Sequence, residues 1–168
     1  GNLGCNIIVD DLSYATEAAF QDGIQALAVN YVTSLGVLYF SSAGNSGNLN
    51  DGTSGVWEGN FNGGGEYDGE TAHVFSGGDI GNTILAASSK GLPVSLQWSD
   101  QYFASDNDYD LYVLDSNGNV VCSSTYGQDG DDYPTEFCGP VPANTRIVVI
   151  LYDGDPARAL HVNSQGGR

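Results

Sequence analysis

The first third of the chain combines short apolar runs with one helical stripe. Residues 5–9 (Cys-Asn-Ile-Ile-Val) form an apolar run typical of a strand covered on both faces. Apolar residues then recur at spacings of three and four from Ile24 to Leu35, which predicts a helix, and Gly36 fits its left-handed stop. A second apolar run occupies residues 37–40. Strand, helix and strand predict one right-handed crossover unit, which is too small to bury both faces of its sheet.

The hydrophobic period changes in the second part of the chain. Residues 49–69 are rich in Gly and Asn, which is typical of a connector. Beyond them, Val94, Leu96 and Trp98 alternate with polar residues, and Asn117-Gly118 is a strong hairpin signal. Further strands are expected over 146–152 and 159–163. Short strands between polar turns predict an antiparallel β-sandwich of jelly-roll type over residues 70–168.

These patterns together predict an α+β protein with three parts. Residues 1–48 are expected to form a partial α/β segment, residues 49–69 a connector and residues 70–168 the β-sandwich.

Composition excludes several classes of partner. The 168 residues include 4 Lys+Arg and 21 Asp+Glu, a formal net charge of -17 at pH 7. Phosphate backbones and anionic membrane surfaces repel such a chain, so neither nucleic acid nor a membrane is expected as a partner. The abundance of Asp, Asn, Gly and Ser, together with the absence of Met, is typical of secreted, loop-rich bacterial proteins. We therefore expect an extracellular protein.

The three cysteines divide into a pair and a remainder. Cys122 and Cys138 flank a polar loop in the strand-rich half. A disulfide closing that loop would contribute about 3 kcal/mol by loop-closure entropy, and the acidic composition favours an oxidising compartment. The alternative is two unpaired, buried thiols. Cys5 lies in an apolar run, which predicts a buried free thiol.

Two segments resemble parts of known families. A helix, a Gly, an apolar strand and then residues 41–45 (Ser-Ser-Ala-Gly-Asn) resemble the oxyanion-hole segment of subtilisin-like serine peptidases. Residues 6–12 resemble the strand whose end lines the substrate cleft in that family. The second half, above all residues 108–115 (Asp-Tyr-Asp-Leu-Tyr-Val-Leu-Asp), resembles the pre-peptidase C-terminal type of β-sandwich. Several bacterial subtilases carry such a sandwich between the oxyanion-hole Asn and the nucleophilic Ser.

The resemblance implies roles for individual residues. Asn45 would be the oxyanion-hole donor, whose amide stabilises charge on the carbonyl oxygen during acyl transfer. Asp11, Leu12 and Ser13 would line the substrate cleft, where the family usually has Ser-Leu-Gly, so the acidic residue leaves substrate preference open. The family's catalytic order is Asp, His, Ser, with the oxyanion Asn between His and Ser. The triad is therefore expected outside these 168 residues, and the chain is not expected to be catalytic alone.

No complete triad is recognisable within the chain. The sequence Gly52-Thr53-Ser54 echoes the family's nucleophile motif, but Gly-Val-Trp follows where Ala-x-Pro is expected, which favours a surface turn. His73 and His161 lie in apolar or alternating contexts, which predicts sandwich side chains with hydrogen-bond partners.

Acidic residues offer a possible calcium site. Asp106, Asp108 and Asp110 are spaced by two and would share one face of a strand, and Ca²⁺ is bound by six to eight oxygens. A second acidic loop holds Asp129, Asp131 and Asp132. The alternative is a solvated acidic rim that keeps the protein soluble.

Two functional hypotheses remain. The first is a segment of a secreted subtilisin-like serine endopeptidase, whose partners are the remainder of the catalytic domain and a protein or peptide substrate. The second is a non-catalytic extracellular binding module, or a structural module that assembles with copies of itself through open strand edges. An enzyme of another kind is disfavoured, because no phosphate loop, zinc-ligand cluster or dinucleotide fingerprint appears.

Overall fold

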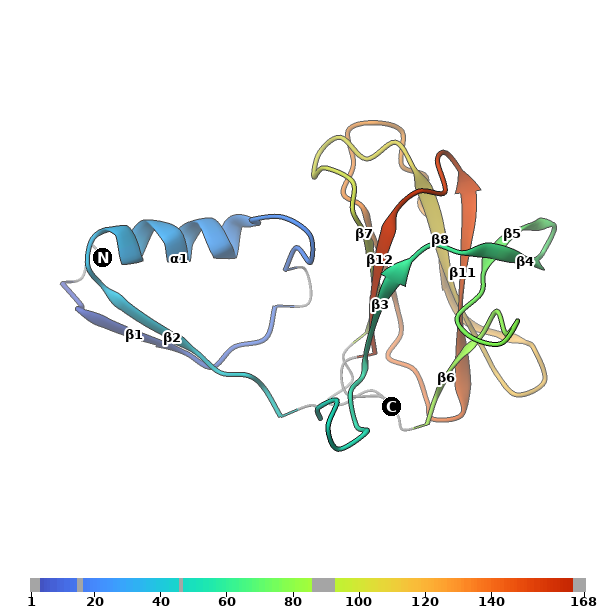
Figure 1. Cartoon of the computed structure of the whole chain (residues 1–168), viewed down its shortest axis with the longest axis horizontal. Coiled ribbons are helices and arrows are strands. Elements are labelled where there is room, and N and C mark those ends of the chain that lie inside the picture. Colours follow the sequence, from blue (N-terminus) through green and yellow to red (C-terminus); the bar gives the residue numbers. More distant parts are fainter. Residues whose placement is uncertain (1–3, 15–16, 46, 86–92, 165–168) are drawn as a thin grey trace. The chain divides into compact units, whose positions relative to one another are not determined.

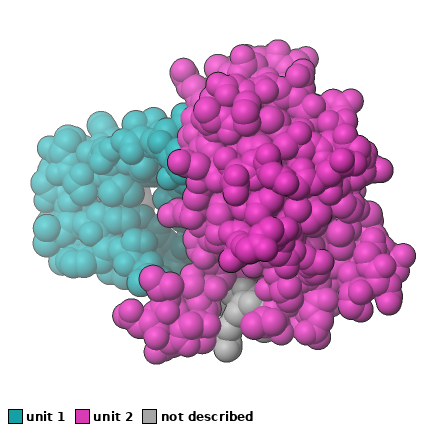
Figure 2. All heavy atoms as spheres, turned by 45° about the vertical axis from the view of Figure 1, so that its right-hand side comes forward, with its two compact units in different colours: residues 1–45 teal, residues 46–168 magenta. Residues whose placement is uncertain are grey.

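The protein is mostly β. The computed structural model describes residues 4–14, 17–45, 47–85 and 93–164, which form two compact units, 1–45 and 46–168 (Figure 2). Regular structure in the described residues comprises twelve strands and one helix of 11 residues. The expected α+β class, with a partial subtilisin-like α/β unit over residues 1–48, is therefore wrong. The described residues contain far more strand than helix. The segment 49–69, expected to be a connector, contributes two of the strands.

The first unit is a two-stranded parallel sheet with one helix (Figure 1). Strand β1 (Ile7–Asp10) precedes helix α1 (Ile24–Ser34) and strand β2 (Leu38–Ser41). β1 and β2 pair in register from Ile7 opposite Leu38 to Asp10 opposite Ser41. Gly36 follows the helix with a φ of +83°, as its sequence position predicts.

Very little of this first unit is buried. Val37 is the single buried side chain among its described residues, and Val9 in β1 remains 77% exposed. Cys5 is a free cysteine, but it is exposed, so the prediction of a buried thiol is wrong. The apolar runs that predict covered strands are present, but the described residues of the unit leave most of their side chains exposed.

The second unit is built from two antiparallel sheets (Figure 1). One has the strand order β10-β7-β12-β3, and the other has the order β4-β5-β11-β8-β9, with β6 also paired to β11. The strands are β3 (Val56–Asn60), β4 (Gly63–Tyr67), β5 (Glu70–His73), β6 (Asn82–Ile84), β7 (Val94–Trp98), β8 (Asp108–Leu114), β9 (Val120–Ser124), β10 (Thr135–Cys138), β11 (Thr145–Asp153) and β12 (Ala159–Asn163).

The hydrophobic core lies between these two sheets. Val94, Leu96 and Trp98 of β7 are fully buried against Leu111 and Val113 of β8, so one cluster contains alternate residues of both sheets. The alternation in residues 94–98 therefore predicts the core face correctly, and the sandwich-like arrangement is confirmed.

The predicted hairpin and disulfide are both present. The hairpin between β8 and β9 closes with the N–H of Asp115 donating to the carbonyl of Asn119 at 2.9 Å. The disulfide Cys122–Cys138 joins β9 of one sheet to β10 of the other. It therefore ties the two layers together at one side of the core.

Candidate functional site

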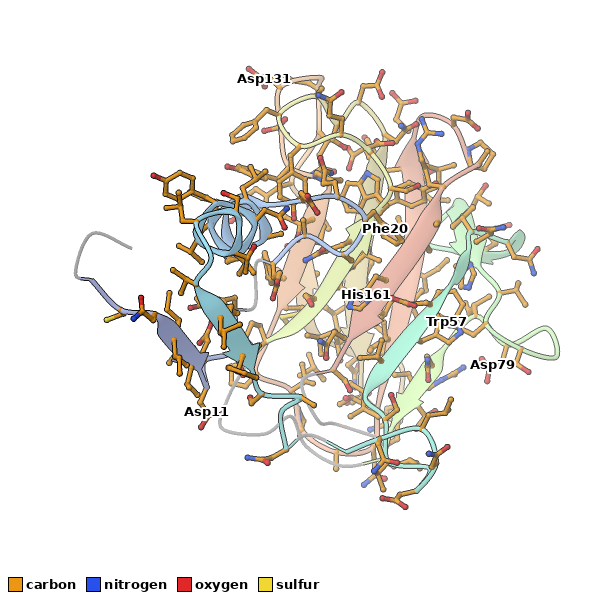
Figure 3. The ribbon with its side chains drawn as sticks, turned by 60° about the vertical axis from the view of Figure 1, so that its left-hand side comes forward. Asp11, Phe20, Trp57, Asp79, Asp131 and His161 are labelled. Atoms are coloured by element: carbon orange, nitrogen blue, oxygen red, sulfur yellow. A yellow bond between two sulfur atoms is a disulfide. The ribbon has the colours of Figure 1, made fainter. Side chains whose placement is uncertain are left out.

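The two segments that the resemblance assigns to substrate binding leave the same edge of the parallel sheet. Asp11, Leu12 and Ser13 follow β1, and Asn45 lies four residues beyond the end of β2. The N–H of Ser42 donates to the carbonyl of Asp10 at 3.0 Å, so the two chains leave the sheet side by side. We call residues 10–13 and 41–45 the carboxyl edge; Figure 3 labels Asp11 within it. Ligands of parallel sheets bind outside this end of the strands.

The residues of the carboxyl edge are open to solvent. Leu12, Ser13 and Asn45 are exposed, and Gly44 adopts a φ of +76° immediately before Asn45. That left-handed conformation strains any residue with a Cβ, which explains why glycine stands there. The Asn45 amide is thus presented on a turn, where it can donate to a bound molecule.

Asp10 organises the turn after β1. Its Oδ2 accepts a hydrogen bond from the Tyr39 hydroxyl, and its Oδ1 accepts the N–H of Leu12 at 3.0 Å. The bond from Tyr39 holds the pKa of the Asp10 carboxyl below its usual range, and the same bond raises the pKa of Tyr39 to about 12. Asp10 therefore stays ionised at neutral pH and acts as an anchor for Leu12.

The Asp10–Tyr39 contact did not emerge from the sequence. In the register Tyr39 pairs with Ile8, and Ile8 lies two positions before Asp10 in β1. The side chains of Tyr39 and Asp10 therefore lie on the same face of the sheet. The available signal was an Asp at the end of one apolar strand and a Tyr within the next. It becomes informative only once the parallel register is known.

Ser54 lies half-buried in the irregular segment between the turn at residues 49–52 and β3, so it is not on the surface turn that the sequence predicts. Its hydroxyl accepts the N–H of Val56 at 3.2 Å. Ser54 also borders a small pocket with Trp57, Asn82 and Ser164, and the described lining contains no histidine and no carboxylate. The pocket therefore brings no general base to Ser54.

Both histidines are sandwich side chains with hydrogen-bond partners, as predicted. His73 is buried in β5, where its Nδ1 accepts the N–H of Asn62 at 2.9 Å and aromatic rings pack around it. Burial lowers the pKa of His73 to about 4, so it is neutral at pH 7. His161 Nδ1 lies 2.7 Å from Glu58 Oε1, across the β12–β3 pair (Figure 3).

The three aspartates proposed as calcium ligands differ in their surroundings. Asp106 is exposed, and its Oδ1 accepts the Asn107 side-chain amide at 3.1 Å. Asp108 and Asp110 are buried in β8. Burial is the largest cause that raises the pKa of Asp108, and it raises the pKa of Asp110 to about 7. The structure therefore groups two of the three.

The second acidic loop does bring its carboxylates together. Oxygens of Asp129, Asp131 and Asp132 lie within 4.8 Å of one another (Figure 3). Asp129 and Asp131 are exposed, and the N–H of Asp129 donates to Asp132 Oδ2 at 3.1 Å. Hydrogen bonding with Asp131 raises the pKa of Asp129. This is the arrangement of a solvated acidic turn.

Comparison with protein-family models and with curated proteins found no match to this chain. Among the described residues, no helix is long and apolar enough to cross a membrane.

Proposed function

We propose that this chain is a segment of an extracellular serine endopeptidase that resembles the subtilisins, with Asn45 as its oxyanion-hole donor. The observation that carries the proposal is the carboxyl edge. The resemblance separately assigns the substrate cleft to Asp11, Leu12 and Ser13 and the oxyanion-hole donor to Asn45. Both segments follow strands of one parallel pair and leave it at the same edge.

In this proposal the carboxyl edge acts on the acyl group of a peptide substrate. Attack on the scissile carbonyl develops negative charge on its oxygen, and a preorganised amide stabilises that charge more than it stabilises the ground state. Asn45 supplies that amide from a turn shaped by Gly44. Asp10 and Tyr39 hold the opposite turn, so that the backbone after β1 keeps its position beside the substrate. The nucleophile and its base belong to polypeptide outside the chain.

The exposed apolar faces of residues 1–45 support a larger assembly. Val9 and Phe40 on the strands and Ile24 on the helix are each more than half exposed. Burying such side chains stabilises a protein by about 25 cal/mol per Å² of apolar area. Further polypeptide of a peptidase domain would cover these faces.

The same faces support a second candidate, a non-catalytic module that assembles with copies of itself. Strand edges and apolar faces left open by the fold are surfaces on which identical chains pair. The two candidates differ in what covers the first unit.

The disulfide, like the composition, supports the extracellular location in this proposal. The disulfide Cys122–Cys138 is of the kind that persists in oxidising compartments. In the proposal, the second unit is an accessory β-sandwich of the secreted enzyme.

Native mass spectrometry of the protein isolated from its source, with a serine-directed fluorophosphonate probe, separates the candidates. We expect the chain to travel with polypeptide that the probe labels. Chains found only with copies of themselves, and without label, would refute the peptidase proposal and support the module.

The role of Asn45 needs its own test in the active assembly. Replacing it as Asn45→Ala should lower kcat by about 10²–10³, the loss seen when a subtilisin loses its oxyanion-hole asparagine, with little change in KM. Asn50→Ala, an exposed asparagine of the following turn, is the matched control and should retain activity. Equal activity of both variants would contradict the assignment.

A further inference from the structure

Two buried carboxylates face the same way on β8. Asp108 and Asp110 are two residues apart in the strand, so their side chains share the face opposite Tyr109 and Leu111 of the core. They are only 8% and 5% exposed. Burial is the largest cause that disfavours ionisation of Asp110, and the negative charges of Asp108, Glu136 and Glu70 add to it. Carboxylates placed together in this way are stabilised by a positive group or by protonation of one of them.

The described arginines do not supply that charge. Arg146 pairs with Asp79, and Arg158 pairs with Asp100 and Asp155. Neither of the two described arginines contributes to the electrostatic surroundings of Asp108 or Asp110. Within the described residues, the carboxylate pair therefore has no basic partner.

Two buried oxygen atoms, one on Asp108 and one on the side chain of Gln128, have no hydrogen-bond donor among the described residues. They are Oδ1 of Asp108 and Oε1 of Gln128, both fully buried. Gln128 is only 8% exposed and touches Asp108 directly, because its backbone N–H donates to the Asp108 carboxylate. Buried acceptors in native proteins nearly always have a partner, since an unsatisfied buried group is costly.

The orientation of the Gln128 amide is set by its neighbours. Its Nε2 donates to Glu136 Oε1 at 3.1 Å and to the carbonyl of Tyr126. If the amide were turned over, its oxygen would face the carbonyl of Tyr126 and Oε1 of Glu136. Both are acceptors, so both hydrogen bonds would be lost. The unpartnered atom is therefore the oxygen, and the site offers acceptors only.

We propose that Asp108, Asp110 and Gln128 bind a calcium ion. Carboxylate and amide oxygens are the ligands that Ca²⁺ prefers, and its six to eight positions and flexible geometry suit a set drawn from a strand and a loop. Mg²⁺ demands a near-octahedral arrangement that such a set does not impose. Glu136 already accepts hydrogen bonds from Ser124, Tyr126 and Gln128, so it orients Gln128 and adds charge. The site is independent of the proposed peptidase function.

Calcium chloride titrated by calorimetry into the chelator-treated 168-residue chain tests the proposal. We expect one saturable site and a higher unfolding temperature with calcium than with chelator. Asp110→Asn should weaken binding at least about tenfold by removing a charged ligand, and Asp108→Asn with Asp110→Asn should abolish it. Both changes are nearly isosteric and relieve repulsion, so the fold, checked by near-ultraviolet circular dichroism, should persist.

The acidic loop provides the matched control. Asp131→Asn removes one carboxylate from the exposed group Asp129, Asp131 and Asp132 and should leave calcium binding unchanged. Loss of binding in Asp131→Asn with binding retained in Asp110→Asn would overturn the proposal and place the ion in the exposed loop. The absence of both a binding heat and a shift in unfolding temperature would also overturn it.

Discussion

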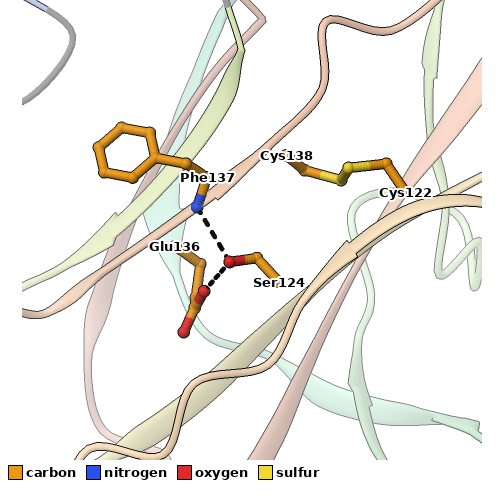
Figure 4. The surroundings of a disulfide bond; sticks show 5 residues. All are labelled: Cys122, Ser124, Glu136, Phe137 and Cys138. Carbon is orange, nitrogen blue, oxygen red and sulfur yellow. Dashed lines mark hydrogen bonds between the residues drawn. A yellow bond between two sulfur atoms is a disulfide. The ribbon is translucent and has the colours of Figure 1, made fainter.

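The hydroxyl of Ser124, in β9, donates a hydrogen bond to the buried carboxylate of Glu136, in β10 (Figure 4). Each residue lies two positions along its strand from a disulfide cysteine, Cys122 or Cys138. A covalent bond and a charged hydrogen bond thus connect the two sheets at neighbouring positions. The N–H of Phe137 also donates to the Ser124 hydroxyl, at 3.3 Å.

The Ser124→Ala variant should lose about 1–3 kcal/mol of unfolding free energy, because Glu136 keeps its burial and loses one of its donors. Urea unfolding at pH 7 measures the difference. Ser123→Ala, at the exposed neighbouring position, is the control and should change stability by less than about 0.5 kcal/mol. Similar losses in the two variants would show that the hydrogen bond to Glu136 is not the cause.

Removing the disulfide should destabilise the second unit by about 2–4 kcal/mol, since the unfolded chain regains the freedom of the closed loop. The double variant Cys122→Ser with Cys138→Ser, compared with the parent in urea without reductant, gives the value. Cys5→Ser should leave stability unchanged, because that thiol is exposed and free. A parent protein whose stability does not respond to reductant would contradict this prediction.

The burial of His73 should make stability depend on pH. Its folded pKa of about 4 lies below the ordinary value of 6.5, so the neutral ring is favoured in the folded state. The stability that the neutral ring contributes is fully present above pH 6.5 and is lost as the pH falls toward 4. The loss reaches about 3 kcal/mol. Unfolding free energies of the parent and of His73→Gln, measured from pH 7.5 to 4.5, should converge as the pH falls. A constant difference across that range would refute the assignment.

Asp100 should contribute far more to stability than Asp155, the other carboxylate that pairs with Arg158. Burial acts to raise the pKa of Asp100, but hydrogen bonds led by those from Asn107 and Arg158 outweigh it and hold the pKa below its usual range. Asp100→Ala leaves the buried Asn107 amide and the half-buried Arg158 without their acceptor, and we expect a loss of about 3–5 kcal/mol.

Asp155→Ala is the comparison for Asp100→Ala. Its carboxylate is 60% exposed and lies 3.4 Å from Arg158, so its removal should change stability by about 1 kcal/mol or less. Thermal unfolding of both variants at pH 7 tests the contrast. Equal losses would mean that burial does not distinguish the two carboxylates.

Local patterns in the sequence determined the elements whose stabilising contacts are themselves local. The helix stop at Gly36 and the Asn117-Gly118 hairpin depend on the backbone freedom of single residues, which composition reveals directly. The alternation of Val94, Leu96 and Trp98 identified a core face, because side chains of a strand alternate between its faces. Spacing and context indicated the Cys122–Cys138 bond.

Only the tertiary structure revealed strand β4 and the arrangement of the acidic residues. The sequence of β4 begins with three glycines, Gly63, Gly64 and Gly65, which have no side chains to show a period of two. A Cβ at Gly65 would lie 2.1 Å from Ile80, so the close packing at this position in the sheet requires glycine. Asp106, Asp108 and Asp110 look equivalent in sequence. The fold buries the last two and brings Gln128 against Asp108 from the loop after β9, because burial depends on contacts between residues distant along the chain.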